Sequence, residues 1–193
     1  MRIIAGTHRG HRLITPKGLD TRPTSDRVRE AAFNLIGPVD GASVLDLFAG
    51  SGAMGLEALS RGAERVVFVE SDRAAARAIE RNLDKLRLRG TILRLDAVSA
   101  LQAEAQAGRL YDLVLVDPPY EMYPALQTAL ARTLPRVFAD DGLLVVETEA
   151  RVEPELPLER RTSRRYGRAR LTLFEHPLRS SGAAGGAAPE GTV

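Results

Sequence analysis

The feature that most constrains the fold is an alternation of short apolar runs with helical patterns across residues 41–150. Val- and Leu-rich runs of this kind are typical of strands covered on both faces. Alternating strand–helix units form parallel sheets with right-handed crossovers. The predicted strands are Ser43–Phe48, Arg65–Glu70, Thr91–Leu95, Tyr111–Asp117 and Leu143–Thr148. The predicted helices are Ala53–Arg61, Arg73–Leu88, Val98–Ala107 and Tyr123–Val137. We therefore expect an α/β, doubly wound sheet.

The chain breaks this alternation after residue 157. Leu158–Arg165 and Arg170–His176 predict an antiparallel hairpin around Tyr166-Gly167. This hairpin brings the expected fold to a seven-stranded, mostly parallel, Rossmann-like sheet. The residues after Pro177 are mostly small or polar, so we expect a disordered tail at 178–193.

The first forty residues form a separate part of the pattern. Residues 1–22 look like short strands broken by glycine and proline. From Thr24, which can serve as N-cap, residues 24–36 predict a helix with one apolar face. Arg27, Arg29 and Glu30 would lie away from much of that face. The predicted domains are an amino-terminal extension at 1–40, a sheet domain at 41–177 and a tail at 178–193.

The composition excludes several kinds of chemistry. The 193 residues suit one domain, and the absence of cysteine rules out disulfides, thiolate metal sites and a cysteine nucleophile. The three histidines show no metal-ligand spacing, so no metal is expected. No apolar run approaches the ~20 residues that cross a bilayer, and the first residues lack a secretory pattern. We therefore expect a cytoplasmic protein that has no membrane partner.

Basic residues gather in two places, although the net charge is only +2. Residues 1–30 hold seven Lys or Arg against three acids, and Leu158–Arg170 holds six Arg against Glu159 alone. Guanidinium groups form forks on phosphates, so the two clusters favour a polyanionic partner. For any single arginine, an arginine-rich composition without such a partner remains an alternative.

The strand predicted at 43–48 runs into a glycine-rich loop, DLFAGSGAMG at residues 46–55. Glycines allow backbone amides to approach a ligand, and open α/β sheets bind ligands outside the carboxyl ends of their strands. Glu70 closes the second predicted strand, where it can accept hydrogen bonds from the two hydroxyls of a ribose. The sequence therefore predicts a nucleotide-like cofactor at this loop.

The glycines alone leave the type of cofactor open. Gly50, Gly52 and Gly55 satisfy the dinucleotide pattern G-x-G-x-x-G, so a nicotinamide cofactor is one alternative. A glycine-rich turn without a ligand is another. Asp46 lies four residues before the first glycine, where its charge can meet the ammonium of an amino-acid-bearing cofactor. We also expect no second domain of the kind that carries a dehydrogenase's substrate site, which favours a methyl-donor cofactor.

The fourth predicted strand ends in Asp117-Pro118-Pro119-Tyr120 and neighbours the cofactor strand in the expected sheet order. Two prolines remove two amide donors, so the backbone there offers mainly acceptors. Such a loop suits an exocyclic amine, whose hydrogens can go to the Asp117 carboxylate and the Pro118 carbonyl while Tyr120 stacks on the base. A paired base cannot reach such a pocket, so the target must be flipped out or unpaired. A proline-stiffened loop without a ligand is the alternative.

These motifs resemble known families. Asp46-x-Phe48-x-Gly50-x-Gly52 resembles motif I of the class I S-adenosylmethionine-dependent methyltransferases, where it cradles the methionine half of the cofactor. The chain also resembles the RsmD family of bacterial 16S ribosomal RNA guanine-N2 methyltransferases over about residues 2–176. This resemblance is carried by RIIAG with Arg9-Gly10, TRPTSDRVREAAFN at 21–34, VLDLFAGSGAMGLEALSRGA and VDPPY.

The resemblance implies S-adenosylmethionine as cofactor and the N2 amine of the guanine at nucleotide position 966, in conventional 16S numbering, as methyl acceptor. The implied partner is 16S ribosomal RNA or the small subunit during its assembly, and we expect a monomer. The residues expected to act are Asp117, Pro118 and Tyr120 in catalysis, Asp46, Phe48, Gly50, Gly52, Glu70, Asp96 and Ala97 at the cofactor, and Arg9, Arg12, Arg22 and Arg27 on RNA.

Some of these roles have local alternatives. Asp96 follows the third strand, where class I enzymes often place an acid that contacts the adenine amine, but it could equally be a helix cap. Each of the four arginines could be a solvated surface residue. In the extension, the resemblance implies RNA contacts and a lid helix.

Other functions remain as alternatives. A DNA adenine-N6 methyltransferase uses the same motif on another base but usually carries a sizeable recognition domain. A protein glutamine methyltransferase could use the same receptor, although that family usually has Asn where Asp117 stands. A non-catalytic RNA-binding assembly factor could keep the fold, but the acids Asp46, Glu70 and Asp117 argue against it. A nicotinamide dehydrogenase is the last alternative.

Overall fold

The computed structural model describes residues 1–16 and 25–176. The helices are α1 (Asp26–Ile36), α2 (Ala53–Ser60), α3 (Arg73–Leu86), α4 (Ala97–Gln106) and α5 (Tyr123–Thr133), and η1 is a 3-10 turn at Leu134–Arg136. The strands are β1 (Ser43–Asp46), β2 (Arg65–Val69), β3 (Thr91–Leu93), β4 (Tyr111–Val116), β5 (Phe138–Glu149), β6 (Glu159–Tyr166) and β7 (Ala169–Glu175). The predicted alternation of strands and helices is therefore present from β1 to β5.

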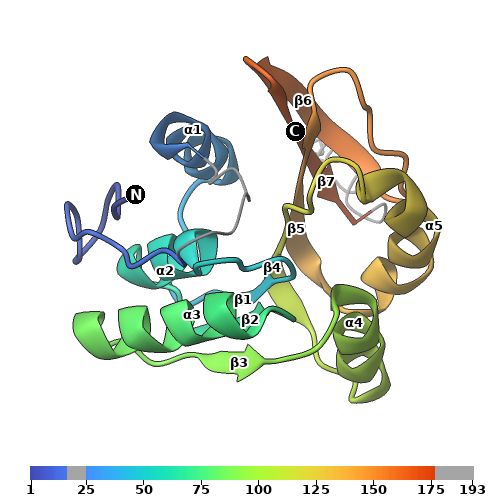
Figure 1. Cartoon of the computed structure of the whole chain (residues 1–193). Coiled ribbons are helices and arrows are strands. Elements are labelled where there is room, and N and C mark those ends of the chain that lie inside the picture. The colour runs from blue at the N-terminus through green and yellow to red at the C-terminus, as the bar shows by residue number, and fades with distance from the viewer. Residues whose placement is uncertain (17–24, 177–193) are drawn as a thin grey trace, which may run out of the picture.

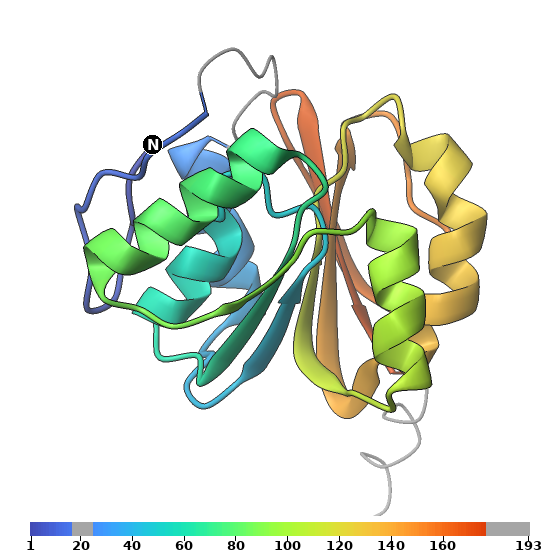
Figure 2. The ribbon, with the colours of Figure 1, turned by 60° about the horizontal axis from the view of Figure 1, so that its bottom comes forward.

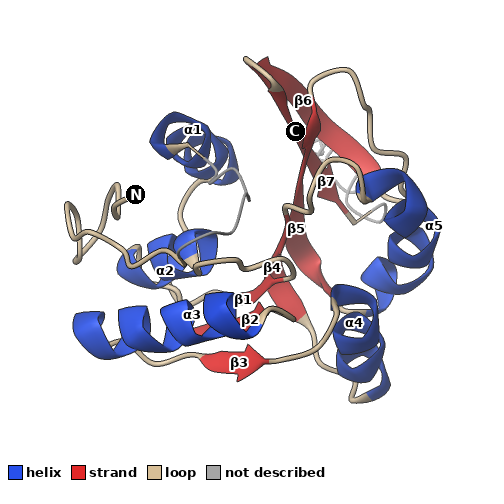
Figure 3. Ribbon diagram, in the orientation of Figure 1, coloured by secondary structure: helices blue, strands red, loops and turns tan. Residues whose placement is uncertain are grey.

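The seven strands form one sheet in the order β3-β2-β1-β4-β5-β7-β6 (Figures 1 and 3). Neighbours among β1–β5 pair in parallel, whereas β7 pairs antiparallel with both β5 and β6. These pairings confirm the doubly wound, mostly parallel sheet and its carboxy-terminal hairpin. The direction of the strand order reverses between β1 and β4, and open α/β sheets bind ligands at this kind of switch point.

Helices cover both faces of the sheet (Figure 2). Helices α1, α2 and α3 pack on one face, and α4 and α5 pack on the other. Successive residues of a strand point to opposite faces, so each strand contributes to two hydrophobic cores. On β1, for example, Val44 joins the core beneath α1–α3 and Leu45 joins the core beneath α4 and α5. Burial on both faces explains why the strands are continuous apolar runs.

Several predicted boundaries are wrong, and the differences bear on the site. Strands β1 to β4 each end one or two residues earlier than predicted, so Phe48, Glu70, Leu95 and Asp117 belong to loops at the carboxyl edge of the sheet. The last helix ends at Thr133, because proline lacks the amide hydrogen that a continuing α-helix needs and the next turn is 3-10. Strand β5 in turn begins at Phe138 rather than five residues later.

The amino-terminal extension also differs from its prediction. Within residues 1–16 the predicted short strands are reduced to one isolated antiparallel bridge between Arg2 and Arg12. Helix α1 begins at Asp26, and its N-cap is Ser25, which accepts a hydrogen bond from the Val28 amide, rather than the predicted Thr24. Thr24 and the predicted tail at 178–193 lie outside the described residues.

Arg29 is the largest departure from the expected pattern of α1. It was predicted to lie away from the apolar face, but its exposed fraction is 0%. The extension itself is anchored by Ile3 and Leu13, which are buried in the same core as α1 and α2. Within residues 1–16 and 25–176, no helix combines the length and apolar character that a membrane span needs.

Candidate active site

Three carboxylates gather at the carboxyl ends of three neighbouring strands. Asp46 is the last residue of β1, and its pairing partners are Phe68 on β2 and Leu115 on β4. Glu70 and Asp117 each lie two residues beyond those partners. The acids therefore flank Asp46 symmetrically, on the strands to either side. The sequence predicted all three as site residues, and the sheet order brings them to one edge.

Asp46 is almost fully buried, with 2% of its surface exposed. Its carboxylate accepts a hydrogen bond of 2.9 Å from the amide of Gly55, in the first turn of α2. Burial raises the pKa of Asp46 to about 7; the bond from Gly55 opposes this rise, and the charges of Asp117 and Glu70 add to it. A positively charged ligand at this position would favour the ionised form.

Glu70 holds the glycine loop in place. One carboxylate oxygen accepts from the Gly50 amide at 2.8 Å, and the other accepts from the Asp72 amide at 2.7 Å. Each carboxylate oxygen has a second lone pair, so acceptor capacity remains for other donors. The contact with a ribose that the sequence predicted for Glu70 is compatible with this arrangement and stays a prediction.

The glycines of the loop serve two different purposes. Gly50 and Gly52 have positive φ values of 55° and 82°, and the Gly52 amide donates to Ala49 in a tight turn at 2.7 Å. Glycine adopts these angles without a steric penalty. Gly55 has no such angle, but a Cβ there would lie 2.3 Å from the ring of Phe68. Gly55 therefore allows α2 to pack closely on β2.

Asn82 is a supporting residue that the sequence analysis missed. It is fully buried on α3, and its side-chain amide donates to the carbonyl of Ser51 in the glycine loop at 3.1 Å. The same side chain exchanges hydrogen bonds with the backbone of Ile14, at 2.7 and 2.9 Å. Asn82 thus ties the amino-terminal extension to the cofactor loop. Its partners lie 31 and 68 residues away, so no local sequence pattern could reveal it.

The remaining predicted cofactor residues lie around this loop. Phe48 is half-buried against the core beneath α4 and α5, and Ala97 is buried at the start of α4. Asp96 is exposed and is the N-cap of α4, where hydrogen bonds from Ser99 lower its pKa. The predicted helix cap is therefore present, and a contact with adenine remains a prediction. Leu95, 43% exposed beside Asp96, is a further candidate for contact with a flat ring.

The predicted catalytic motif forms the loop between β4 and α5. Asp117 and Tyr120 are half-buried, Pro118 is buried and Pro119 is exposed. The Tyr120 hydroxyl donates a 3.0 Å hydrogen bond to Glu147, a residue of β5 that is 8% exposed. This bond fixes the ring of Tyr120 relative to the carboxyl end of β5.

Glu147 is a site residue that the sequence analysis did not find. In the sequence it is one acid at the end of an apolar run. The β4–β5 register pairs Val116 with Val146, which places Glu147 beside Asp117. An acid directly after the last buried valine pair of a central strand could have been a signal, because charged side chains are seldom buried without a role.

The predicted RNA-contacting arginines lie in the extension and on α1. Arg9, Arg12 and Arg27 are exposed, as such a role requires. Arg22 lies outside the described residues. Three candidates for contact with a polyanion therefore lie within the described residues, and a solvated role for each remains the alternative. Arg22 stays a prediction.

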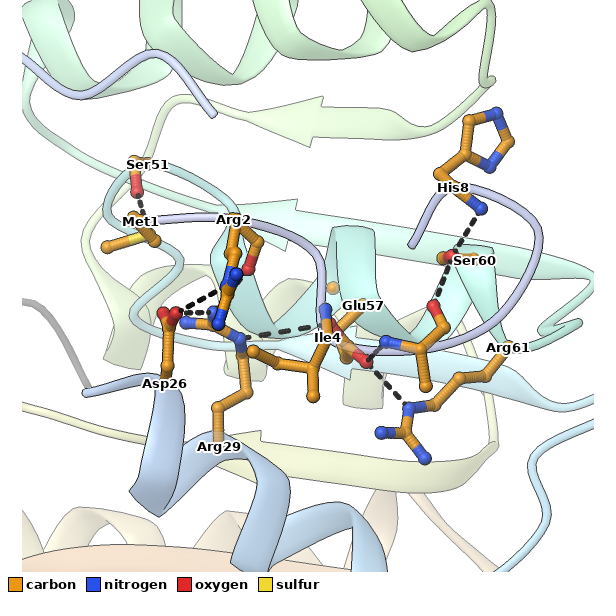
Figure 4. Close-up of polar contacts among 12 residues, drawn as sticks. Met1, Arg2, Ile4, His8, Asp26, Arg29, Ser51, Glu57, Ser60 and Arg61 are labelled. Carbon is orange, nitrogen blue, oxygen red and sulfur yellow. Dashed lines mark hydrogen bonds and ion pairs between the residues drawn. The ribbon is translucent and has the colours of Figure 1, made fainter. Parts of the chain in front are cut away.

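The extension is fastened to α2 by a buried polar network, shown in Figure 4. The carboxylate of Glu57, which is 0% exposed, accepts from the amides of Ile4 and Ala5 at 2.7 and 2.9 Å and pairs with Arg61 at 2.8 Å. It also lies 3.8 Å from the guanidinium of Arg29.

Arg29 in turn connects α1 to the first residues of the chain. Its guanidinium donates to the Arg2 carbonyl at 2.5 Å and to the Asp26 carboxylate at 2.9 Å. Because α2 starts at the glycine loop, this network joins α1, the extension and the cofactor loop into one unit.

The residues at the loop fit an amino-acid-bearing, positively charged cofactor such as S-adenosylmethionine. Burial is the main cause of the raised pKa of Asp46, and the charges of two neighbouring acids add to it, so a bound cation would favour the ionised carboxylate. Helix α2 presents its amino terminus at Gly52, which has no side-chain cap, and such termini attract carboxylates. The donor set therefore suits a ligand that carries both an ammonium and a carboxylate group.

Comparisons with known proteins show the family to which the chain belongs. The family model described as conserved hypothetical protein 95 matches residues 1–175. Ribosomal RNA small subunit methyltransferase D of Escherichia coli K12 is 42% identical over 159 residues, which cover 81% of this chain and 78% of that protein. The YlbH protein of Bacillus subtilis 168 is 41% identical over 158 residues, 79% of this chain and 85% of that protein.

Structural similarity extends over nearly the whole chain. The solved structure of the Escherichia coli protein yhhF superposes with a TM-score of 0.80 at 37% identity, covering 91% of this chain and 97% of that one. The chain therefore belongs to the family described as conserved hypothetical protein 95, the RsmD family that its sequence motifs resemble.

Proposed function

We propose that this protein transfers a methyl group from S-adenosylmethionine to the exocyclic N2 amine of a guanine in 16S ribosomal RNA. The observation that carries the proposal is the position of Asp117-Pro118-Pro119-Tyr120. This motif starts directly after β4, next to the buried Asp46 at the end of β1 and the glycine loop that follows it. An acceptor-rich loop thus lies beside a site suited to a cationic cofactor.

S-adenosylmethionine, when bound, supplies an electrophilic methyl group on a sulfonium. Asp46 would hold its ammonium, the amino terminus of α2 its carboxylate, and Glu70 its ribose hydroxyls. Gly50 and Gly52 would let the backbone approach it, with Phe48, Asp96 and Ala97 towards the adenine. The remaining tasks of the protein are to bind and align the acceptor.

The acceptor amine would donate one hydrogen to the Asp117 carboxylate and the other to the Pro118 carbonyl. Its lone pair then points towards the methyl carbon, and alignment of this kind can contribute several kcal/mol, about 7–11 in favourable model systems. The N–C bond forms as the C–S bond breaks, and the electron pair of the C–S bond stays on sulfur. The nitrogen then loses a proton, which the Asp117 carboxylate can accept.

Tyr120 would stack on the guanine ring, a contact that contributes about 1–3 kcal/mol. Its hydroxyl is bound to Glu147, so the ring would already be oriented before the base arrives. The stacked base must leave its own stack or helix, which favours an unpaired nucleotide. The resemblance to the RsmD family points to nucleotide position 966 of the small-subunit RNA.

The choice of ribosomal RNA rests on the relatives. Several proteins that share 36–42% identity with this chain are named ribosomal RNA small subunit methyltransferase D. The exposed Arg9, Arg12 and Arg27 are available for phosphate contacts. We propose that the monomer acts in the cytoplasm on the small subunit during assembly.

The test supplies radiolabelled S-adenosylmethionine with four acceptors: undermethylated small subunits, naked 16S RNA, double-stranded DNA and a protein extract. Asp117→Ala serves as the inactive control. The modified nucleotide is then mapped by nuclease digestion and mass spectrometry of nucleosides. We expect label in N2-methylguanosine from 16S RNA or small subunits. Label in DNA adenine, in protein glutamine or in no acceptor would contradict the proposal.

A further inference from the structure

Strand β6 forms one edge of the sheet (Figure 1). Its sequence, with that of the turn that follows, carries a dense group of arginines. Edge strands often carry charges simply to prevent pairing with other chains. The number of arginines therefore says little, and what matters is whether each arginine is exposed and already paired with an acid. Arg160 pairs with Glu153 at 3.2 Å, and Arg161 pairs with Glu175 at 3.1 Å. Both lie in the first half of β6.

The arginines at the other end of the hairpin differ. Arg164, Arg165 and Arg168 are exposed, and their side chains take part in none of the ion pairs found within the described residues. Arg170 is close in sequence but 4% exposed, and it is bound to Glu153, Ser163 and the Ala150 carbonyl. Of these four arginines, Arg164, Arg165 and Arg168 have guanidinium groups available to bind another molecule, and Arg170 does not.

The register places this end of the hairpin at the active-site edge of the sheet. Arg164 pairs with Leu171 on β7, and Leu171 pairs with Glu147 on β5. Glu147 lies beside Asp117. Arg164 is therefore three strand spacings from the catalytic loop, about 14 Å at the usual separation of ~4.8 Å. In Figure 2 the orange turn between β6 and β7 stands at the same edge as the loop that follows β4.

We propose that Arg164, Arg165 and Arg168 form a phosphate-binding tip that contacts the RNA backbone next to the target nucleotide. This inference rests on the proposed function, because it takes RNA as the substrate. Phosphate contacts set the position of a nucleic acid, whereas the base itself is selected at the catalytic loop. Arginine forks suit phosphate oxygens, and guanidinium groups without carboxylate partners remain available for them.

The tip also complements the extension. Arg9, Arg12 and Arg27 belong to residues 1–36, whereas the tip is formed by the other end of the chain. Arg9 follows His8, whose ring contacts the Leu86 carbonyl at the far end of α3, so Arg9 lies away from the carboxyl ends of the strands.

Arg27 follows Asp26, which pairs with Arg2, and the neighbouring Met1 contacts Ser51 in the glycine loop. An RNA strand that passes over the carboxyl ends of β1 and β4 would therefore meet Arg27 on one side and the tip on the other. A nucleotide held on both sides can be presented to Tyr120 without base pairing.

The test uses the triple variant Arg164→Ala/Arg165→Ala/Arg168→Ala. A matched control, Arg89→Ala/Arg132→Ala/Arg136→Ala, removes the same charge from three exposed arginines near the amino ends of β3 and β5. Affinity for 16S RNA is measured by fluorescence anisotropy from 50 to 300 mM KCl. Methyl transfer is measured separately, and thermal melting checks that each variant is folded.

Each phosphate contact contributes about 0.7 to the slope of log affinity against log salt for a single strand. We therefore expect the tip variant to lose about 2 from that slope and to raise KM for RNA while kcat at saturation stays unchanged. The control should keep the slope of the unsubstituted protein. Equal slopes and equal KM values for tip variant and control would overturn the inference.

Binding and turnover are separated so that the two proposals can fail separately. RNA binding with the expected slopes but without methyl transfer would contradict the proposed function and support the phosphate-binding tip. Methyl transfer to guanine with no effect of the tip substitutions would support the proposed function and contradict the phosphate-binding tip. A protein that binds no RNA at any salt concentration would overturn both.

Discussion

Asp46 and Asp117 end neighbouring strands, yet their surroundings differ. Asp46 is 2% exposed, bound to the Gly55 amide and crowded by two other acids, and its pKa is raised to about 7. Asp117 is half-buried at the start of a loop stiffened by two prolines. Both acids lie where an open α/β sheet binds ligands, and the comparison teaches that burial and neighbouring groups determine which ligand suits each acid. The surroundings of Asp46 suit the cationic group of a bound cofactor, and those of Asp117 suit the amine of a substrate.

The largest effect should come from Asp117→Ala, which removes the proposed acceptor of the amine hydrogen and of the departing proton. We expect turnover to fall about 10²–10⁴-fold, the range for loss of an acid–base or charge-stabilising group. Affinity for S-adenosylmethionine, measured by calorimetry, should stay within about threefold, because we propose that the residue binds the acceptor and not the cofactor. Asp140→Ala, an exposed acid near the amino end of β5, is the matched control. Turnover equal to that of the Asp140→Ala control would contradict the account in which Asp46 binds the cofactor and Asp117 binds the acceptor amine.

Asp46→Asn should mainly affect the cofactor. The amide keeps an oxygen for the Gly55 hydrogen bond but removes the negative charge. We expect affinity for S-adenosylmethionine to fall about 10–100-fold, since a hydrogen bond to a charged group contributes about 1.5–3 kcal/mol. Turnover at saturating cofactor should change much less than in Asp117→Ala. Unchanged affinity in calorimetry would contradict an ammonium contact at Asp46.

The raised pKa of Asp46 also predicts a pH dependence of cofactor affinity. If binding requires the ionised carboxylate, affinity should rise about fivefold between pH 6 and pH 7, because the ionised fraction of a group with a pKa of about 7 increases by that factor. Asp46→Asn should flatten this rise. A pH profile that the substitution leaves unchanged would contradict a role for Asp46 in this pH dependence.

In the protein without cofactor, the raised pKa of Asp46 lowers the free energy of unfolding as pH rises, whereas it makes cofactor affinity increase with pH. The folded-state pKa of Asp46 lies above the ordinary value of 3.8, so between these two pH values the native state holds a proton that the unfolded state has already released. The contribution of Asp46 to the free energy of unfolding therefore falls as pH rises from about 4 to about 7. Asp46→Asn should raise the melting temperature at pH 8 more than at pH 4. Equal changes at both pH values would contradict the shift.

The smallest expected effect belongs to Tyr120→Phe. The ring that stacks on the base remains, but the hydrogen bond to Glu147 is lost, so we expect turnover to fall about two- to threefold, at the low end of the ~0.5–1.5 kcal/mol net value of a hydrogen bond. Tyr120→Ala should lose about tenfold or more, because stacking contributes about 1–3 kcal/mol. Turnover assays at saturating RNA compare the two. Equal losses would argue against stacking.

The sequence predicted the features that depend on local pattern. The apolar runs of β1 to β5 predicted a parallel sheet, and the positions of Asp46 and Asp117 at the carboxyl ends of two of its strands placed both acids at one edge. Glycine loops and proline pairs can be recognised locally because each restricts the backbone in a specific way. The family resemblance then supplied the cofactor and the substrate class.

The features that the sequence did not reveal depend on contacts between distant residues. Arg29 is buried because Glu57, on a different helix, lies beside it, whereas helical periodicity treats any arginine as a surface residue. Asn82 reaches the glycine loop because α3 packs beside it, and Glu147 lies beside Asp117 because of the β4–β5 register. Polar residues at such positions support a site without any local motif.

The most direct test of the central claim is a crystal structure of this protein with S-adenosylhomocysteine and guanosine. The account predicts the guanine N2 amine about 3 Å from both the Asp117 carboxylate and the Pro118 carbonyl, with the ring against Tyr120. The amino group of the cofactor product should contact Asp46. A guanosine bound with its amine turned away from Asp117, or a cofactor whose amino group lies far from Asp46, would contradict the account.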